Sequence, residues 1–297
     1  MPNHILISGP VSWNSIVYLD HLPEPRPHMQ FALEDFETVG GTSAGKALHL
    51  TGLGRNVTCL TVMGDDEASR RLRPVLESAG IELAAATIPG PSERHVNLMT
   101  RAGERVSLYL STPVFQEPDV VQFRTLAEGA EALVMDLSES SRALLSPAAA
   151  SSIPIWTDIH DYDGKSDFHE PFIHAASYIF MNADGMPDPL PFMRARVDAG
   201  AAVVVCTLGA EGAMALDAVG LHRVDAVPAD IRDTNGAGDA FFAGFLHATL
   251  SGGSTDGALA AAAAQAVVAL EAKHLHPSVE GAHVAGDVER GEIPTKT

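Results

Sequence analysis

The feature that most constrains the fold of this chain is a repeated alternation between short apolar runs and helical patterns. Six runs are typical of β-strands, at residues 5–8, 57–63, 132–137, 153–158, 177–181 and 202–208. Strands that alternate with helices form a mostly parallel sheet with helices on both faces. The sequence therefore predicts a doubly wound α/β fold, and polar residues after several runs place candidate binding groups at the carboxyl edge of the sheet.

Two segments interrupt this alternation. Residues 11–37 are rich in proline and acidic groups, and in residues 94–113 apolar side chains alternate with other residues on either side of a predicted turn at 101–104. We expect both to contribute to a small discontinuous β lid on a single domain spanning 1–297. The Ala-rich stretch 258–273 predicts a closely packed helix.

Composition excludes several classes of function. The chain has 19 basic and 38 acidic residues, a formal charge of −19, which disfavours nucleic-acid partners. It has neither a bilayer-spanning apolar run nor a signal-peptide pattern at its start. Cys59 and Cys206 lie in strand-like apolar runs and are predicted to be buried thiols. We expect a cytoplasmic protein with no membrane partner.

The most informative stretch is D-T-N-G-A-G-D at residues 233–239, followed by an apolar helical pattern. Gly236 and Gly238 allow a ligand to approach the backbone closely, and the helix start directs free N–H groups at the same point. Asp239 would lie in the first helical turn, where it could accept a proton from a hydroxyl. The plainer alternative, a helix cap beside an ordinary turn, does not account for the complete run.

This run resembles the phosphate-binding signature of the ribokinase-like (PfkB) family of carbohydrate and nucleoside kinases. Three other segments resemble family landmarks in the expected order: G-G-T-S-A-G-K-A at 40–47, T-L-G-A-E-G at 207–212 and L-H-P-S at 275–278. The resemblance covers nearly the whole chain. It implies a ribokinase-like fold and ATP-dependent phosphorylation of a hydroxyl on a sugar-like or nucleoside-like acceptor.

The resemblance also implies roles for particular residues. Asp239 would be the general base, beside an anion hole of backbone N–H groups from Gly236, Ala237 and Gly238. The expected nucleotide-binding residues are Thr207, Gly209, Gly212, Thr234 and Asn182, and the expected acceptor-binding residues are Asn14, Gly40, Gly41 and Gly45. Mg²⁺ is the implied metal, and the resemblance allows a K⁺ site near Asp233 and Asn235. An exposed lid face would permit a homodimer through the lid.

The chain departs from the family pattern mainly on the acceptor side. Asn14 stands where sugar kinases commonly have Asp, Gly45 replaces an Asn, and Ser138 lies near a usual Glu. In the family motif N-x-x-E, Gly185 takes the place of the glutamate; Asp184 could supply a carboxylate to Mg²⁺ through water, or be an ordinary loop acid. These changes leave open a nucleoside kinase or a catalytically weak metabolite-binding protein.

Other nucleotide and metal motifs are excluded. Residues 40–47 nearly match the phosphate loop of other nucleotide hydrolases, but Ala47 stands where Ser or Thr is needed, and 34–39 are mixed and acidic instead of a buried strand. We therefore predict that Lys46 lies at the surface or near the lid. No histidine spacing indicates zinc, and no dinucleotide fingerprint follows residues 5–8. Asp158 is expected to shape the space between the two substrates.

Overall fold

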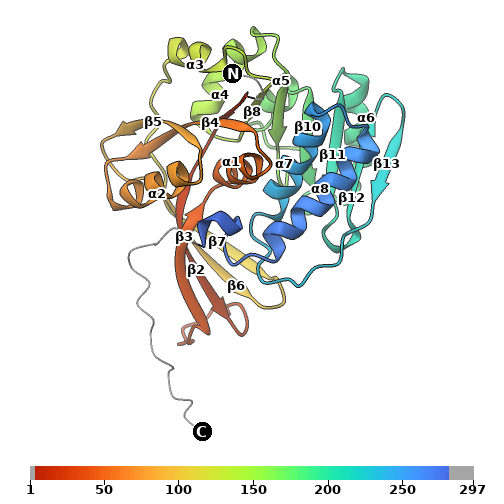
Figure 1. Cartoon of the computed structure of the whole chain (residues 1–297). Coiled ribbons are helices and arrows are strands. Elements are labelled where there is room, and N and C mark those ends of the chain that lie inside the picture. Colours follow the sequence, from red (N-terminus) through yellow and green to blue (C-terminus); the bar gives the residue numbers. More distant parts are fainter. Residues whose placement is uncertain (1–3, 281–297) are drawn as a thin grey trace.

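The computed structural model describes residues 4–280, and its main element is a nine-stranded sheet (Figure 1). Seven strands run parallel, in the spatial order β11-β10-β9-β8-β1-β4-β5, and β12 and β13 extend the β11 edge antiparallel. Their bounds are β1 His4–Ser8, β4 Asn56–Gly64, β5 Glu82–Ile88, β8 Ala132–Met135, β9 Ile155–Asp158, β10 Tyr178–Asn182, β11 Val203–Thr207, β12 Ala213–Asp217 and β13 Leu221–Val224.

Helices cover both faces of this sheet and create two cores. On one face lie α1 (Thr42–Gly52), α2 (Glu67–Ser78), α7 (Ala237–Leu250) and α8 (Thr255–Leu270). On the other lie α3 (Val120–Ala127), α4 (Glu139–Ala149), α5 (Glu170–Ala175) and α6 (Leu190–Asp198). Strand β1 contributes side chains to both cores, because Ile5 and Ile7 point to one face and Leu6 to the other. Burial on both faces explains the continuous apolar runs.

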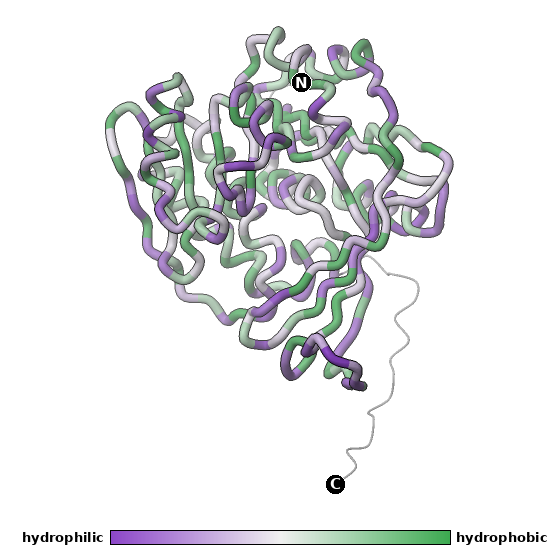
Figure 2. The backbone as a smooth tube through the Cα atoms, turned by 180° about the vertical axis from the view of Figure 1, so that it is seen from behind, coloured by the Kyte–Doolittle hydropathy of each residue, from purple (hydrophilic) through white to green (hydrophobic). Residues whose placement is uncertain are grey.

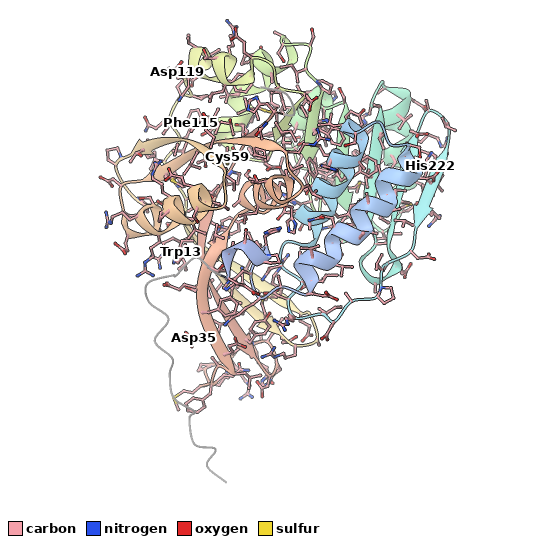
Figure 3. The ribbon with its side chains drawn as sticks, viewed as in Figure 1. Trp13, Asp35, Cys59, Phe115, Asp119 and His222 are labelled. Carbon is pink, nitrogen blue, oxygen red and sulfur yellow. The ribbon has the colours of Figure 1, made fainter. Side chains whose placement is uncertain are left out.

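The lid is a separate four-stranded sheet, ordered β3-β2-β6-β7, which projects from one end of the molecule (Figure 1). Its strands are β2 Ser12–Leu19, β3 Glu34–Gly40, β6 Glu93–Thr100 and β7 Arg105–Ser111. Trp13 lies at its base and Asp35 towards its free end (Figure 3), which is largely hydrophilic (Figure 2). The β6–β7 turn occupies 101–104, as predicted, with Gly103 at φ 89°.

The lid contacts the segment that leads into helix α7. The Tyr18 hydroxyl donates to the carbonyl of Arg232 at 3.4 Å. Asn235 donates its amide to Met99 Sδ at 2.9 Å and accepts from the Arg105 guanidinium at 2.9 Å. Strands β2, β6 and β7 therefore fix the lid against the residues that precede α7.

All six predicted strand runs contain strands, with ends shifted by one or two residues, and the predicted C-terminal helix is α8. Three strands of the main sheet were not predicted: β5, β12 and β13. Residues 34–39, expected not to form a buried strand, lie in β3 of the lid. Cys59 and Cys206 are buried free thiols, as predicted. No helix within residues 4–280 is both long and apolar enough to cross a membrane.

Candidate active site

A fully buried lysine lies where helix α1 meets the carboxyl edge of the main sheet. The Lys46 ammonium group is 2.7 Å from Asp136, 3.4 Å from Asp239 and 3.5 Å from Asp158, and its side chain has no exposed surface. It also lies 4.9 Å from the ring centre of Phe242. Of the two positions predicted for Lys46, at the surface or near the lid, the surface position is therefore wrong, because three carboxylates compensate its burial.

Each carboxylate in this cluster comes from a different element. Asp136 follows β8, Asp158 ends β9, and Asp239 lies in the first turn of α7. Asp136 is fully buried and accepts from Lys46 through Oδ1 and from the Ser43 hydroxyl through Oδ2, both at 2.7 Å. Asp158 accepts from the backbone N–H of His160 at 3.0 Å. The fold thus brings together one cation and three acids from distant parts of the chain.

Asp239 is held asymmetrically. Its Oδ1 accepts from the Thr42 hydroxyl at 2.6 Å and lies near Lys46, which also donates to Thr42. Its Oδ2 has no hydrogen-bond partner among residues 4–280 and faces Gly45, where an added Cβ would lie 2.6 Å from it. The side chain remains 15% exposed. One oxygen is therefore anchored and the other is accessible beside a position without a side chain.

Electrostatics differ among the charged groups. Burial alone would lower the pKa of Lys46, but the three carboxylates raise it above its usual range. Burial raises the pKa of Asp239, and Lys46 and Thr42 oppose that shift. Burial also opposes ionisation of Asp158, yet His160 and Lys46 together hold its pKa below the ordinary value. The lysine therefore favours the ionised form of both acids.

The start of helix α7 provides free backbone donors next to Asp239. Gly236 is its N-cap at φ 78°, a conformation that favours glycine, and an added Cβ would lie 2.9 Å from Leu275. Within the described residues, the N–H groups of Gly238 and Asp239 have no acceptor, whereas that of Ala237 contacts the Thr234 carbonyl at 3.5 Å. An added Cβ at Gly238 would meet nothing within 4 Å. The amides can therefore receive an anion.

The diglycine segment packs closely against the first lid strand. Asn14 is buried, and an added Cβ at Gly40 would lie 2.0 Å from its amide nitrogen. Gly41 caps helix α1 at φ 92°, with the carbonyl of Pro10 only 2.7 Å from where its Cβ would be. Asn14 accepts from the Ser12 hydroxyl at 2.7 Å. The predicted acceptor-binding residues Asn14, Gly40, Gly41 and Gly45 therefore lie along α1 and the base of the lid. Helix α1 contacts Asp239 from this side.

The predicted nucleotide-binding residues follow neighbouring strands. Thr207 and Asn182 are register partners at the ends of β11 and β10. Gly209 begins a 3-10 turn (Gly209–Glu211) at φ 59° and Gly212 caps it at φ 88°. An added Cβ at Gly212 would lie 2.0 Å from the carbonyl of Val224. Thr234 lies near the lid turn, since its methyl would be 3.8 Å from a Cβ added to Gly103. This side of the site consists mainly of backbone.

The structure gives a physical reason for the absent family glutamate. An added Cβ at Gly185 would lie 2.0 Å from the carbonyl of Asp161, so no side chain fits there. The neighbouring Asp184 is exposed, and its N–H donates to Asn182 at 3.0 Å. No cluster of three potential metal ligands occurs within residues 4–280. Asp184 can therefore offer a carboxylate only to a metal that keeps other ligands, as water-rich Mg²⁺ does.

The predicted monovalent-cation residues already have protein partners. Asp233 is buried and accepts from the backbone N–H of Asn235 at 2.7 Å. The side-chain oxygen of Asn235 accepts from Arg105 at 2.9 Å. Arg105 therefore places a positive charge beside this segment. Ser138, the other altered position, caps helix α4 by accepting from the N–H of Ser141 at 3.0 Å.

Sequence reasoning missed several members of this site. Lys46 was misplaced, and neither Thr42 nor Asp136 was proposed as a site residue. Two signals were available. Asp136 and Asp158 lie at the ends of neighbouring predicted strands, which places carboxylates at one edge, and Lys46 lies in a helix made mostly of small and apolar residues. A buried lysine was the natural partner for acids converging on that edge.

Comparisons with known proteins identify similar molecules. The family model "pfkB family carbohydrate kinase" matches residues 188–280. Acarbose 7(IV)-phosphotransferase of Actinoplanes sp. is 28% identical over 255 residues, covering 84% of this chain and 85% of that protein. ATP-dependent ribose-1-phosphate kinase of Halopiger xanaduensis is 25% identical, covering 86% and 88%.

Solved structures agree in fold. The microbiome-derived acarbose kinase Mak1 is 30% identical, with a TM-score of 0.81, covering 90% of this chain and 93% of its own. Ribokinase from Thermotoga maritima, at 19% identity, has a TM-score of 0.74 and covers 93% and 97%. The doubly wound fold with a separate lid sheet is therefore confirmed.

Proposed function

The chain belongs to the pfkB family of carbohydrate kinases, and from this premise we propose that it transfers the γ-phosphoryl group of ATP to a hydroxyl of a sugar or sugar-like molecule. Members of this family use ATP, typically with Mg²⁺. The observation that carries the proposal is Asp239, a part-exposed carboxylate in the first turn of α7, beside N–H groups that lack acceptors. A proton acceptor and an anion site are adjacent there.

In the proposed reaction, Asp239 takes the proton of the acceptor hydroxyl as its oxygen attacks the γ-phosphorus. The new O–P bond forms while the bond to the β,γ-bridging oxygen breaks, and ADP leaves. Backbone N–H groups of Gly236, Ala237 and Gly238 stabilise negative charge on the transferring group. Thr207, Asn182, Gly209, Gly212 and Thr234 hold the nucleotide.

The acceptor is proposed to lie between helix α1 and the lid base, near Asn14, Gly40, Gly41 and Gly45. Gly45 lets the Asp239 carboxylate pack against helix α1, because an added Cβ there would lie 2.6 Å from Oδ2. Lys46 already pairs with three acids, so it offers no free charge to an anionic acceptor. A neutral or cationic polyhydroxyl compound fits these charges. Two relatives act on acarbose, by their names, which supports a sugar-like acceptor.

Two ions belong to the proposal. Mg²⁺ would be held by Asp184, waters and nucleotide phosphates, and when bound it would neutralise charge on the phosphates. A K⁺ ion at Asp233 would have to compete with Arg105, which engages the neighbouring Asn235. Equal turnover in potassium and choline salts would remove the K⁺ site from the proposal.

A homodimer through the lid stays a prediction. Strand β7 exposes Val106, Leu108, Tyr109 and Leu110 by 41–67% of their surface. A copy of the same strand could cover them, since an exposed apolar strand edge tends to pair. Light scattering of the protein and of Leu108→Glu would test this: a monomer in both cases would eliminate the lid dimer.

The function is tested by measuring ADP release with ATP-Mg²⁺ and a panel of acceptors. The panel contains monosaccharides, oligosaccharides including acarbose, ribose 1-phosphate and nucleosides. We expect turnover with at least one neutral sugar-like compound and none with ribose 1-phosphate. Preferential turnover of nucleosides would favour the nucleoside kinase, for which the 25% identical nucleoside kinase of Methanothermobacter thermautotrophicus is a precedent. Acceptor-induced thermal stabilisation without ADP from any compound would favour the metabolite-binding protein.

A further inference from the structure

We propose that Lys46 is a positioning residue that keeps Asp239 ionised and fixes which of its oxygens acts as the base. This inference rests on the proposed kinase function and extends it to a residue outside the phosphate-binding turn. It starts from a physical anomaly: an ammonium group with no exposed surface, surrounded by three carboxylates. Burying such charges costs several kcal/mol unless they compensate one another.

The hydrogen bonds assign different tasks to the two oxygens of Asp239. Thr42 donates to Oδ1 at 2.6 Å, and Lys46 lies 3.4 Å from Oδ1 while donating to Thr42. The lysine and the threonine therefore act together on a single oxygen. Oδ2 has no partner within residues 4–280 and is the one free to receive the acceptor proton.

Gly45 completes this arrangement from the neighbouring position. A Cβ there would lie 2.6 Å from Oδ2 and 2.9 Å from Cβ of Asp239, so any larger residue would displace the acid. Residues 45 and 46 thus act as a pair: the glycine makes room for the Asp239 carboxylate against α1, and the lysine lies near its Oδ1. Helix α1 contributes both.

The charges around Asp239 come from all the elements packed against it. Helix α1 contributes Lys46, the edge after β8 contributes Asp136, and β9 and its following loop contribute Asp158 and His160. Without the lysine, three acids would share a buried space with only a part-exposed histidine nearby. Since like charges and burial both favour the neutral acid, Asp239 would then be protonated at higher pH and would be lost as a base.

Lys46→Met removes the charge and keeps much of the side chain's bulk. In pH profiles of kcat, we expect its acidic limb to move to higher pH, so that turnover falls by about 10-fold or more at pH 6 and by much less at pH 9. Arg73→Met, which removes a surface charge paired with Glu77, should leave the profile unchanged. A purely structural role would lower turnover equally at all pH values, and that result would overturn the proposal.

Two further variants cover the case in which Lys46→Met fails to fold. Lys46→Met combined with Asp136→Asn removes one charge of each sign, and the amide oxygen introduced by the second substitution can still accept from Ser43. Thr42→Val removes only the hydroxyl that donates to Oδ1. We expect the same direction of pH shift in both, smaller for Thr42→Val. If the acidic limb of the kcat profile stayed at the wild-type pH in both variants, the proposal would be overturned.

Asp239→Asn separates this inference from the function on which it rests. If that variant turns over normally, the proposed base is wrong and the inference fails with it. If it is inactive while the Lys46 variants keep the wild-type pH profile, only the inference fails.

Discussion

The two sides of the candidate site are built from different materials. On the proposed acceptor side, buried and charged side chains converge from α1, β8, β9 and α7 around Lys46. On the proposed nucleotide side, glycines and backbone groups dominate, as at Gly212 and the start of α7. Phosphate binding by backbone amides depends on chain geometry, whereas the acceptor side depends on ionisation. The acceptor side should therefore respond strongly to charge and pH, and the nucleotide side to backbone conformation.

The largest effect on stability should come from the charged side. Lys46→Met should lower the free energy of unfolding by about 3–5 kcal/mol near neutral pH, because it leaves buried acids without their cation. The loss should shrink as the pH falls towards about 4, where the carboxylates become protonated. Urea denaturation measures both effects. If Lys46→Met and Arg73→Met lowered the free energy of unfolding by amounts within about 0.5 kcal/mol of each other, the predicted contrast between the two sides would be wrong.

A steric change beside Asp239 should act on rate more than on stability. Gly45→Ala places a methyl 2.6 Å from Oδ2, so the acid must move, and we expect kcat to fall by about 100-fold. Gly257→Ala is the matched control, because its added Cβ would have an ordinary 3.5 Å contact with Ser254. Steady-state kinetics of both variants decide the point: similar kcat values would mean that Gly45 does not protect Asp239.

The nucleotide side should respond to backbone strain. Gly212→Ala places a Cβ 2.0 Å from the carbonyl of Val224 at φ 88°, which should cost about 1–3 kcal/mol and raise KM for ATP more than it lowers kcat. Gly252→Ala has a similar φ of 85° but no neighbour within 4 Å. An unchanged KM for ATP in Gly212→Ala, with weakened acceptor binding instead, would show that the sides are wrongly assigned.

The smallest effect is expected at the exposed acid near the nucleotide. Asp184→Asn should lower the affinity for Mg²⁺ by about 10-fold, because the residue would contact the metal through water. The value of kcat at saturating Mg²⁺ should stay unchanged. Titration of activity with Mg²⁺ measures this, with the exposed Asp188→Asn as control. Equal Mg²⁺ affinity in both variants would make Asp184 an ordinary loop acid.

Local sequence patterns predicted most of the elements and the local structure around Asp239. The glycine turn that opens α7, the placement of Asp239 in its first turn and the β6–β7 hairpin all follow from short-range rules. Strands β5 and β12 were missed because their alanines do not distinguish strand from helix, and β13 because it is half polar and largely exposed instead of forming an apolar run.

The charged cluster could not be predicted by the same rules. A lysine is usually exposed, and only the meeting of α1 with three distant acids makes its burial favourable. Gly185 teaches the same lesson, since the missing glutamate is explained by the carbonyl of Asp161, which is distant in sequence. Both features depend on contacts between segments that no local pattern encodes.

The most direct test of the central claim is the turnover of Asp239→Asn with the best acceptor, measured beside its affinity for ATP by calorimetry. The substitution keeps the shape of the side chain and removes its basic carboxylate. We predict that kcat falls by about 10²–10⁴-fold while ATP affinity stays unchanged. Wild-type turnover in a folded variant would contradict the account.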